Sequence, residues 1–179
     1  MSEIADRIEW LRNKPAAITV QLVALNFALQ AIVVALSTSG ALKGVVHETA
    51  RITHALFGLT GIPATLVDNK IYLASIVLTI NEDCSGLFVL AGYIALVAAY
   101  PASRWSIARA LGLGIPLLMV ANFSRLVFVG QVSQRFPWAF DMVHDVLFRV
   151  AMVLVALLLW YLLSVREYIP WSVRSEARH

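Results

Sequence analysis

The composition of this 179-residue chain is that of a membrane protein, because 60% of its residues are hydrophobic and only 14% are charged. Soluble domains average about 45–50% apolar and about 25% charged residues. The net charge of +3 is small and the basic residues form no stripe, which argues against a nucleic-acid partner. The single cysteine excludes an intramolecular disulfide and a multi-thiolate metal site, and we expect no cofactor and no bound metal.

Four hydrophobic segments are about long enough to cross a bilayer, which requires about 20 apolar residues in a helix. They cover residues 16–36, 84–100, 109–129 and 146–163. A cleaved signal peptide is the alternative for the first segment, but its apolar core would normally be only about 7–15 residues long. The sequence therefore predicts an all-α integral membrane protein with about four transmembrane helices.

The segment between the first two hydrophobic stretches has a different pattern. Residues 41–60 place a polar stripe beside an apolar one, which predicts an amphipathic helix at the membrane surface or packed on the bundle. Asp68-Asn69 is a turn signal, and the β-branched run of residues 71–80 is too short to cross as a helix. We therefore expect a short hairpin-like segment on the same face.

The distribution of basic residues predicts the orientation in the membrane. The N-terminal segment, the short loop 101–108 and the C-terminal segment together carry seven basic residues, whereas the longer loops on the other side carry four, and the more basic side faces the cytoplasm. The expected organisation is a cytoplasmic segment at 1–15, a membrane-embedded catalytic domain at 16–165 with an outer-face insert at 40–83, and a cytoplasmic tail at 166–179.

Three chemically reactive residue types share the outer face in this topology. Cys84 opens the second span, Arg125 lies near the end of the third, and His144 just precedes the fourth. Their shared side depends only on the last three spans. A thiol, a guanidinium and an imidazole are the parts of a cysteine nucleophile with its base and oxyanion partner.

Cys84 lies in the stretch Asn81-Glu-Asp-Cys-Ser-Gly-Leu87. A lone cysteine is more often a small inert hydrophobe than a nucleophile. At a helix N-terminus, however, the helix dipole would lower the thiol pKa from about 8.5. Glu82 and Asp83 would raise that pKa if ionised nearby, whereas Asp83 could instead cap the helix.

Arg125 follows Asn122 by three residues within an apolar run. An arginine at the centre of a membrane helix costs about 2.5–3.5 kcal/mol on insertion scales. We place Arg125 about 6 Å below the mouth of its helix, where it either extends to the surface or acts as a fixed cation beside the thiolate. Asn122 shares its helical face and could orient the guanidinium or bind substrate.

His144 is the natural base, because an imidazole titrates near neutral pH. Asp141 could orient it, although the neighbouring Asp145 is equally available. His47 and His54 share a helical face but lack acidic partners at ligand spacing, so an interfacial polar face is the better interpretation than a metal site. His47 remains a fallback base.

These motifs resemble the exosortase/archaeosortase family of membrane cysteine transpeptidases. The resemblance rests on Glu82-x-Cys84-Ser85-Gly86, on Asn122-x-x-Arg125 and on His144, in that order and in a hydrophobic context. It implies that Cys84 is the nucleophile, Arg125 a catalytic cation and His144 the acid/base. Phe148 departs from the family pattern, which often has glycine four residues after the histidine. The sequence is also shorter than those of larger members, which carry extra N-terminal helices.

The resemblance also implies a partner and a reaction. The substrates would be exported surface proteins with a C-terminal sorting tail, made of a short Pro-containing signature, a hydrophobic helix and a basic end. Cleavage at the outer face of the plasma membrane would pass through a thioester and transfer the protein to an amine acceptor. The alternatives are a membrane cysteine endopeptidase that only hydrolyses, and a non-catalytic subunit in which Arg125 binds a small anion between helices.

Overall fold

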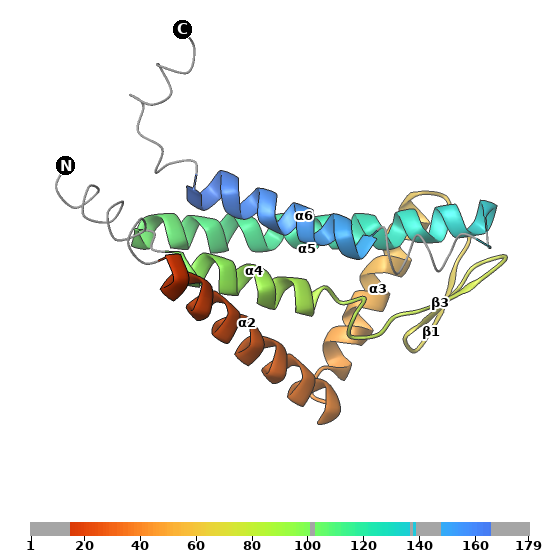
Figure 1. Cartoon of the computed structure of the whole chain (residues 1–179). Helices are drawn as coiled ribbons and strands as arrows, with labels where there is room; N and C mark the ends of the chain where they lie inside the picture. The colour runs from red at the N-terminus through yellow and green to blue at the C-terminus, as the bar shows by residue number, and fades with distance from the viewer. Residues whose placement is uncertain (1–14, 101–102, 137, 139–147, 166–179) are drawn as a thin grey trace, which may run out of the picture.

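The chain folds mostly into helices, with a small sheet at one end of the molecule (Figure 1). The computed structural model describes residues 15–100, 103–136, 138 and 148–165. The helices are α2 (Pro15–Thr38), α3 (Lys43–Leu59), α4 (Leu87–Ala99), α5 (Arg104–Arg135) and α6 (Phe148–Trp160), which continues as the π-helix η3 (Tyr161–Val165). His144, Asp141 and Asp145 lie outside the described residues.

The apolar helices agree with the predicted all-α membrane protein. Two of them, α2 over Ala16–Thr38 and α5 over Arg104–Arg135, are long and apolar enough to cross a membrane. The other two apolar helices, Leu87–Ala99 and Arg149–Val165, are shorter. The 13 residues of α4 extend about 20 Å, which is less than the hydrocarbon layer of about 30 Å.

Helix α5 is longer than its apolar core and organises the rest of the fold. Ser103 caps its start by accepting a hydrogen bond from the Ser106 amide at 3.1 Å. Tyr93 of α4 donates to the Ala110 carbonyl at 2.9 Å, and a Cβ added to Gly114 would overlap the Tyr93 ring. The two backbones therefore approach closely at a position where only glycine fits, and this contact anchors the bundle core.

A second core lies at the other end of α5, where α3 and the sheet pack on it (Figure 1). Helix α3 is amphipathic as expected and buries Val46, Ala50 and Phe57 on one face. Phe57 occupies the space that a Cβ on Gly130 of α5 would need. The amphipathic segment is thus packed on the bundle helix α5.

The expected hairpin is a three-stranded antiparallel sheet in the order β1-β2-β3. Its strands are β1 (Thr65–Val67), β2 (Lys70–Tyr72) and β3 (Val77–Thr79). Leu66, Ile71 and Leu78 are aligned across the strands, and Ile71 and Leu78 are buried against the second core. The prediction missed the break after β2, where the Leu73 amide bonds the Ile76 carbonyl at 2.9 Å and turns the chain back as β3.

Candidate functional site

The stretch that contains Cys84 is a series of tight turns between the sheet and α4. The Cys84 amide donates to both the carbonyl and the side-chain oxygen of Asn81, each at 3.1 Å. The Ser85 hydroxyl donates to the Glu82 carbonyl at 2.5 Å. These local bonds fold the chain into a compact turn and hold the cysteine backbone before the helix begins.

The placement of Cys84 corrects an expectation from the sequence. Helix α4 begins at Leu87 and its N-cap is Gly86, with no side-chain cap. Cys84 therefore does not open the helix, and Asp83 does not cap it. Gly86 has φ of 79°, and this left-handed residue is what allows the turn to enter the helix.

The Cys84 side chain is buried, with 1% of its surface exposed. It belongs to the second core beside Leu78, Ile80 and Leu126, and its Sγ lies 3.9 Å from the Thr79 carbonyl oxygen. The sheet positions the cysteine because the Ile80 amide and carbonyl bond the backbone and side chain of Asn69, both at 2.8 Å.

Asn122 joins the cysteine turn to Arg125. Its Nδ2 donates to the Cys84 carbonyl at 2.9 Å, and its Oδ1 accepts from Arg125 Nη1 at 3.4 Å. All three side chains are buried, with Asn122 at 1% and Arg125 at 7% exposure. A Cβ on Gly86 would lie 3.1 Å from the Asn122 amide, so this asparagine packs directly against the turn.

Arg125 lies deeper along its helix than the sequence suggested. Helix α5 continues to Arg135, so Arg125 is about 15 Å from that end and not at a helix mouth. Of the two alternatives for this side chain, extension to the surface does not occur, because the residue is almost fully buried beside Asn122. The last turns of α5 carry polar residues, so the hydropathy pattern did not predict that the helix continues to Arg135.

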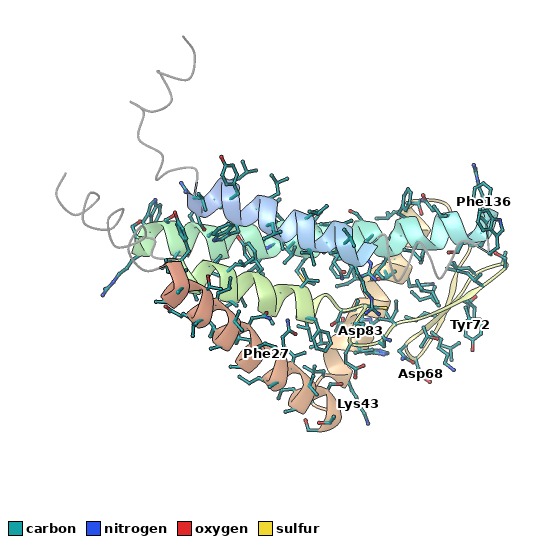
Figure 2. The ribbon with its side chains drawn as sticks, viewed as in Figure 1. Phe27, Lys43, Asp68, Tyr72, Asp83 and Phe136 are labelled. Atoms are coloured by element: carbon teal, nitrogen blue, oxygen red, sulfur yellow. The ribbon has the colours of Figure 1, made fainter. Side chains whose placement is uncertain are left out.

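A groove of about 720 Å³ opens beside this cluster, between α2, α4 and α6. Asp83, Arg125 and Arg149 line it, together with apolar side chains and the polar pair Asn26 and Gln30 of α2. Figure 2 shows Asp83 near the start of α4, at the end of the bundle that faces α3. The sequence analysis missed Asn26 and Gln30, although two polar residues four apart in an apolar span are a signal of function.

The histidines of α3 have separate surroundings. The His54 Nε2 lies 3.1 Å from the Ala64 carbonyl, which ties α3 to the residue before β1. His47 is exposed, and Arg51 forms an exposed ion pair with Glu48 at 2.8 Å. Among the described residues, no three His, Cys, Asp or Glu side chains gather as metal ligands.

The structure thus brings together Cys84, Ser85, Gly86, Asn122 and Arg125 at one end of an apolar helical bundle. This defines the class: a helical membrane protein with a buried polar cluster at one end of its apolar helices. A family model described as transmembrane exosortase matches residues 10–161. The chain belongs to the transmembrane exosortase family, which confirms the family predicted from the sequence. Neither a search of curated proteins nor a search of solved structures finds a match.

Proposed function

We propose that this chain is a cysteine transpeptidase that removes the C-terminal sorting tail of exported proteins. The observation that supports it best is the hydrogen-bonded connection from the Cys84 carbonyl through Asn122 to Arg125. It links the backbone of the only cysteine of the chain to a buried cation. A cation held next to a nucleophile is suited to stabilise the oxyanion that forms during acyl transfer.

The proposed reaction has two acyl-transfer steps. The Cys84 sulfur attacks the scissile carbonyl carbon, the peptide C–N bond breaks, and the thiol proton reaches the leaving amine by way of His144. The product is a thioester on Cys84 and a released tail. An incoming amine then attacks the thioester, which forms a new amide and restores the thiol.

Each residue of the cluster has a distinct role in this proposal. Arg125 stabilises the developing oxyanion, and Asn122 holds Arg125 and the cysteine turn in register. Asn81, Ser85 and Gly86 shape the turn that carries the nucleophile. Because Cys84 is 1% exposed, the substrate reaches the sulfur only after the residues that cover it move. His144 acts as the acid/base, with Asp141 as its orienting partner.

The proposed location of the reaction follows from charge and topology. Basic residues flank the ends of the chain, so we infer that both termini are cytoplasmic and that the protein crosses the plasma membrane several times. Helices α2 and α4 run in opposite directions, which places the cysteine turn at the far end from Pro15 (Figure 1). The cluster then faces the cell exterior or the periplasm.

The test compares the C-termini of exported proteins in cells that carry the wild-type chain or Cys84→Ala. We expect tails to be removed only with the wild type, and the new C-termini to carry the mass of an added amine. Ser39→Ala, a change of an exposed residue at the end of α2, is the matched control and should process normally. Membrane levels of each variant are measured in parallel.

Each other outcome selects an alternative. New C-termini that end in a free carboxylate would make the protein an endopeptidase that only hydrolyses. Tail removal that continues in Cys84→Ala cells would contradict the nucleophile assignment. Absence of any tail removal, together with anion binding that survives Cys84→Ala, would favour the non-catalytic subunit.

A paired substitution tests the base. We expect His144→Ala to stop tail removal and His47→Ala to leave it unchanged, because His47 is exposed on α3 and no hydrogen bond in the described residues ties it to the cluster. The opposite result would assign the proton transfer to His47.

A further inference from the structure

A groove of about 720 Å³ lies between α2, α4 and α6, beside the cysteine cluster. Helix α4 forms its floor, because α2 and α6 each pack on α4. The lining residues extend from Leu22 to Gln30 on α2 and from Phe88 to Leu96 on α4, which is about 12 Å or two helical turns. Val23, Val153 and Leu157 on its walls are partly exposed apolar side chains.

One end of the groove reaches the candidate site. The charged residues that line it are Asp83, Arg125 and Arg149, which come from the turn before α4, from α5 and from the start of α6. Arg125 is the residue that bonds Asn122, so the groove and the cysteine cluster share a side chain. A chain segment that lies in the groove therefore leads directly to the cluster.

The α2 side of the groove carries a fixed hydrogen-bond donor. Gln30 Nε2 donates to the Phe88 carbonyl at 2.9 Å and to Asn26 Oδ1 at 3.4 Å. A backbone carbonyl can only accept a hydrogen bond, so the NH₂ group of Gln30 must face the Phe88 carbonyl. The same NH₂ group donates to Asn26 Oδ1, which leaves Asn26 Nδ2 on the other side of its amide. Within the described residues Asn26 Nδ2 makes no hydrogen bond, and half-buried Asn26 lines the groove.

We propose that this groove seats one apolar helix of the protein that is cut, and that Asn26 selects a helix with a hydrogen-bond acceptor facing it. A serine, threonine, asparagine or glutamine side chain supplies such an acceptor. The inference rests on the proposed function for the identity of the helix. The helix binds in the groove, and Asn26 sets how deep it lies in the membrane and which of its faces is turned toward α2.

Physical arguments favour a peptide helix over a lipid chain. A polypeptide at membrane depth must be helical, because only a helix satisfies its own backbone groups there. An acyl chain offers no acceptor to Asn26 Nδ2, whereas a polar side chain on a helix does. Gly92 on the floor leaves room for close approach, since a Cβ there would meet only Asn26 Oδ1, at 3.6 Å.

The first test is photo-crosslinking with a model helix, which does not depend on catalysis. The probe is a 20-residue peptide of leucine and alanine flanked by lysines, with one central serine, in phosphatidylcholine/phosphatidylglycerol vesicles. The full-length chain carries benzoylphenylalanine at Val23 or Leu157, which line the groove. The controls carry it at Phe27 (labelled in Figure 2) or Leu158, which are exposed and do not line it.

We expect the serine peptide to crosslink at the groove positions and not at the controls. A matched peptide with alanine in place of the serine should crosslink about threefold less, the scale of one hydrogen bond between membrane helices. Asn26→Leu should remove that difference, whereas Gln21→Leu, at an exposed position of α2 that does not line the groove, should keep it.

The second test fills the groove. Gly92→Leu should reduce crosslinking at least tenfold and reduce tail removal in cells. Gly92→Ala adds only an ordinary contact, and Gly112→Leu adds the same side chain at an exposed glycine of α5 with nothing nearby, so both should behave as wild type.

Several results would overturn the inference. Equal crosslinking at groove and control positions, or crosslinks to phospholipid chains alone, would show that the groove is not a helix seat. Equal crosslinking of both peptides would remove the role of Asn26. These outcomes can be told apart from failure of the proposed function. If tail removal continues in Cys84→Ala cells, the proposed chemistry is wrong, but the crosslinking of the model peptide still tests the groove.

Discussion

The Cys84 carbonyl accepts a hydrogen bond from Asn122 Nδ2 at 2.9 Å, across a sequence separation of 38 residues. This bond ties the turn before α4 to the middle of α5. Because Asn122 also accepts from Arg125, one amide sets the distance between the cysteine backbone and the buried cation. The cluster therefore depends on one small side chain that uses its donor and its acceptor at the same time.

Replacing this amide should separate the two parts of the cluster. We expect Asn122→Leu to leave the Cys84 carbonyl without its donor, which costs about 1–3 kcal/mol of stability for a buried group. Tail removal should fall more than the amount of folded protein does. Thermal unfolding in detergent and processing in cells measure the two effects. Normal processing by Asn122→Leu would show that the bridge has no part in the reaction.

Gly86 should be intolerant of a side chain for two separable reasons. Its φ of 79° costs a non-glycine residue about 1–2 kcal/mol, and a Cβ would press on Asn122 at 3.1 Å. Gly61 is the matched control, because its φ is 73° and nothing lies near its Cβ position. We expect Gly86→Ala to lower the unfolding temperature more than Gly61→Ala does. Equal losses would mean that Asn122 simply moves aside.

Cys84 should react slowly with a membrane-impermeant alkylating reagent, because only 1% of its surface is exposed. Asn122→Ala should speed the labelling by loosening the turn. The control is a chain with Cys84→Ala and Ser39→Cys, whose thiol is exposed at the end of α2 and should label quickly. In intact cells both thiols should label from outside. Labelling of Ser39→Cys only after permeabilisation would reverse the proposed orientation.

Arg125 should matter far more than a surface arginine. Removing one oxyanion donor typically costs about 10²–10³ in rate, so Arg125→Ala should reduce tail removal by that factor. Arg51→Ala removes a cation from an exposed ion pair on α3, which contributes only about 0–1 kcal/mol, and should process normally. Rates come from pulse-chase labelling of an exported protein. Similar rates for both variants would remove Arg125 from the proposed mechanism.

The helices were predictable where hydrophobic pattern alone decides the structure. Helix α2 is apolar along most of its length, and the amphipathic stripe of α3 marks the face that Val46 and Phe57 bury. The outer turns of α5 were not predicted, because Gln131, Gln134 and Arg135 are polar. They are helical because this end of α5 packs on α3 in the second core. The third strand was missed because residues 71–80 form one largely apolar stretch without a Gly, Pro, Asn or Asp to mark a turn.

The sequence by itself determined the membrane class and the family, because hydropathy and short motifs are local properties of the chain. It also predicted that Cys84 and Arg125 share a side of the membrane, from the alternation of the hydrophobic spans. Only the tertiary structure decided that Cys84 is buried, that Asn122 bridges it to Arg125, and that a groove leads away from them. Those features depend on how α4, α5 and the sheet pack at close range. Packing is set by shape complementarity between distant segments, such as Gly86 against Asn122, which no local pattern encodes.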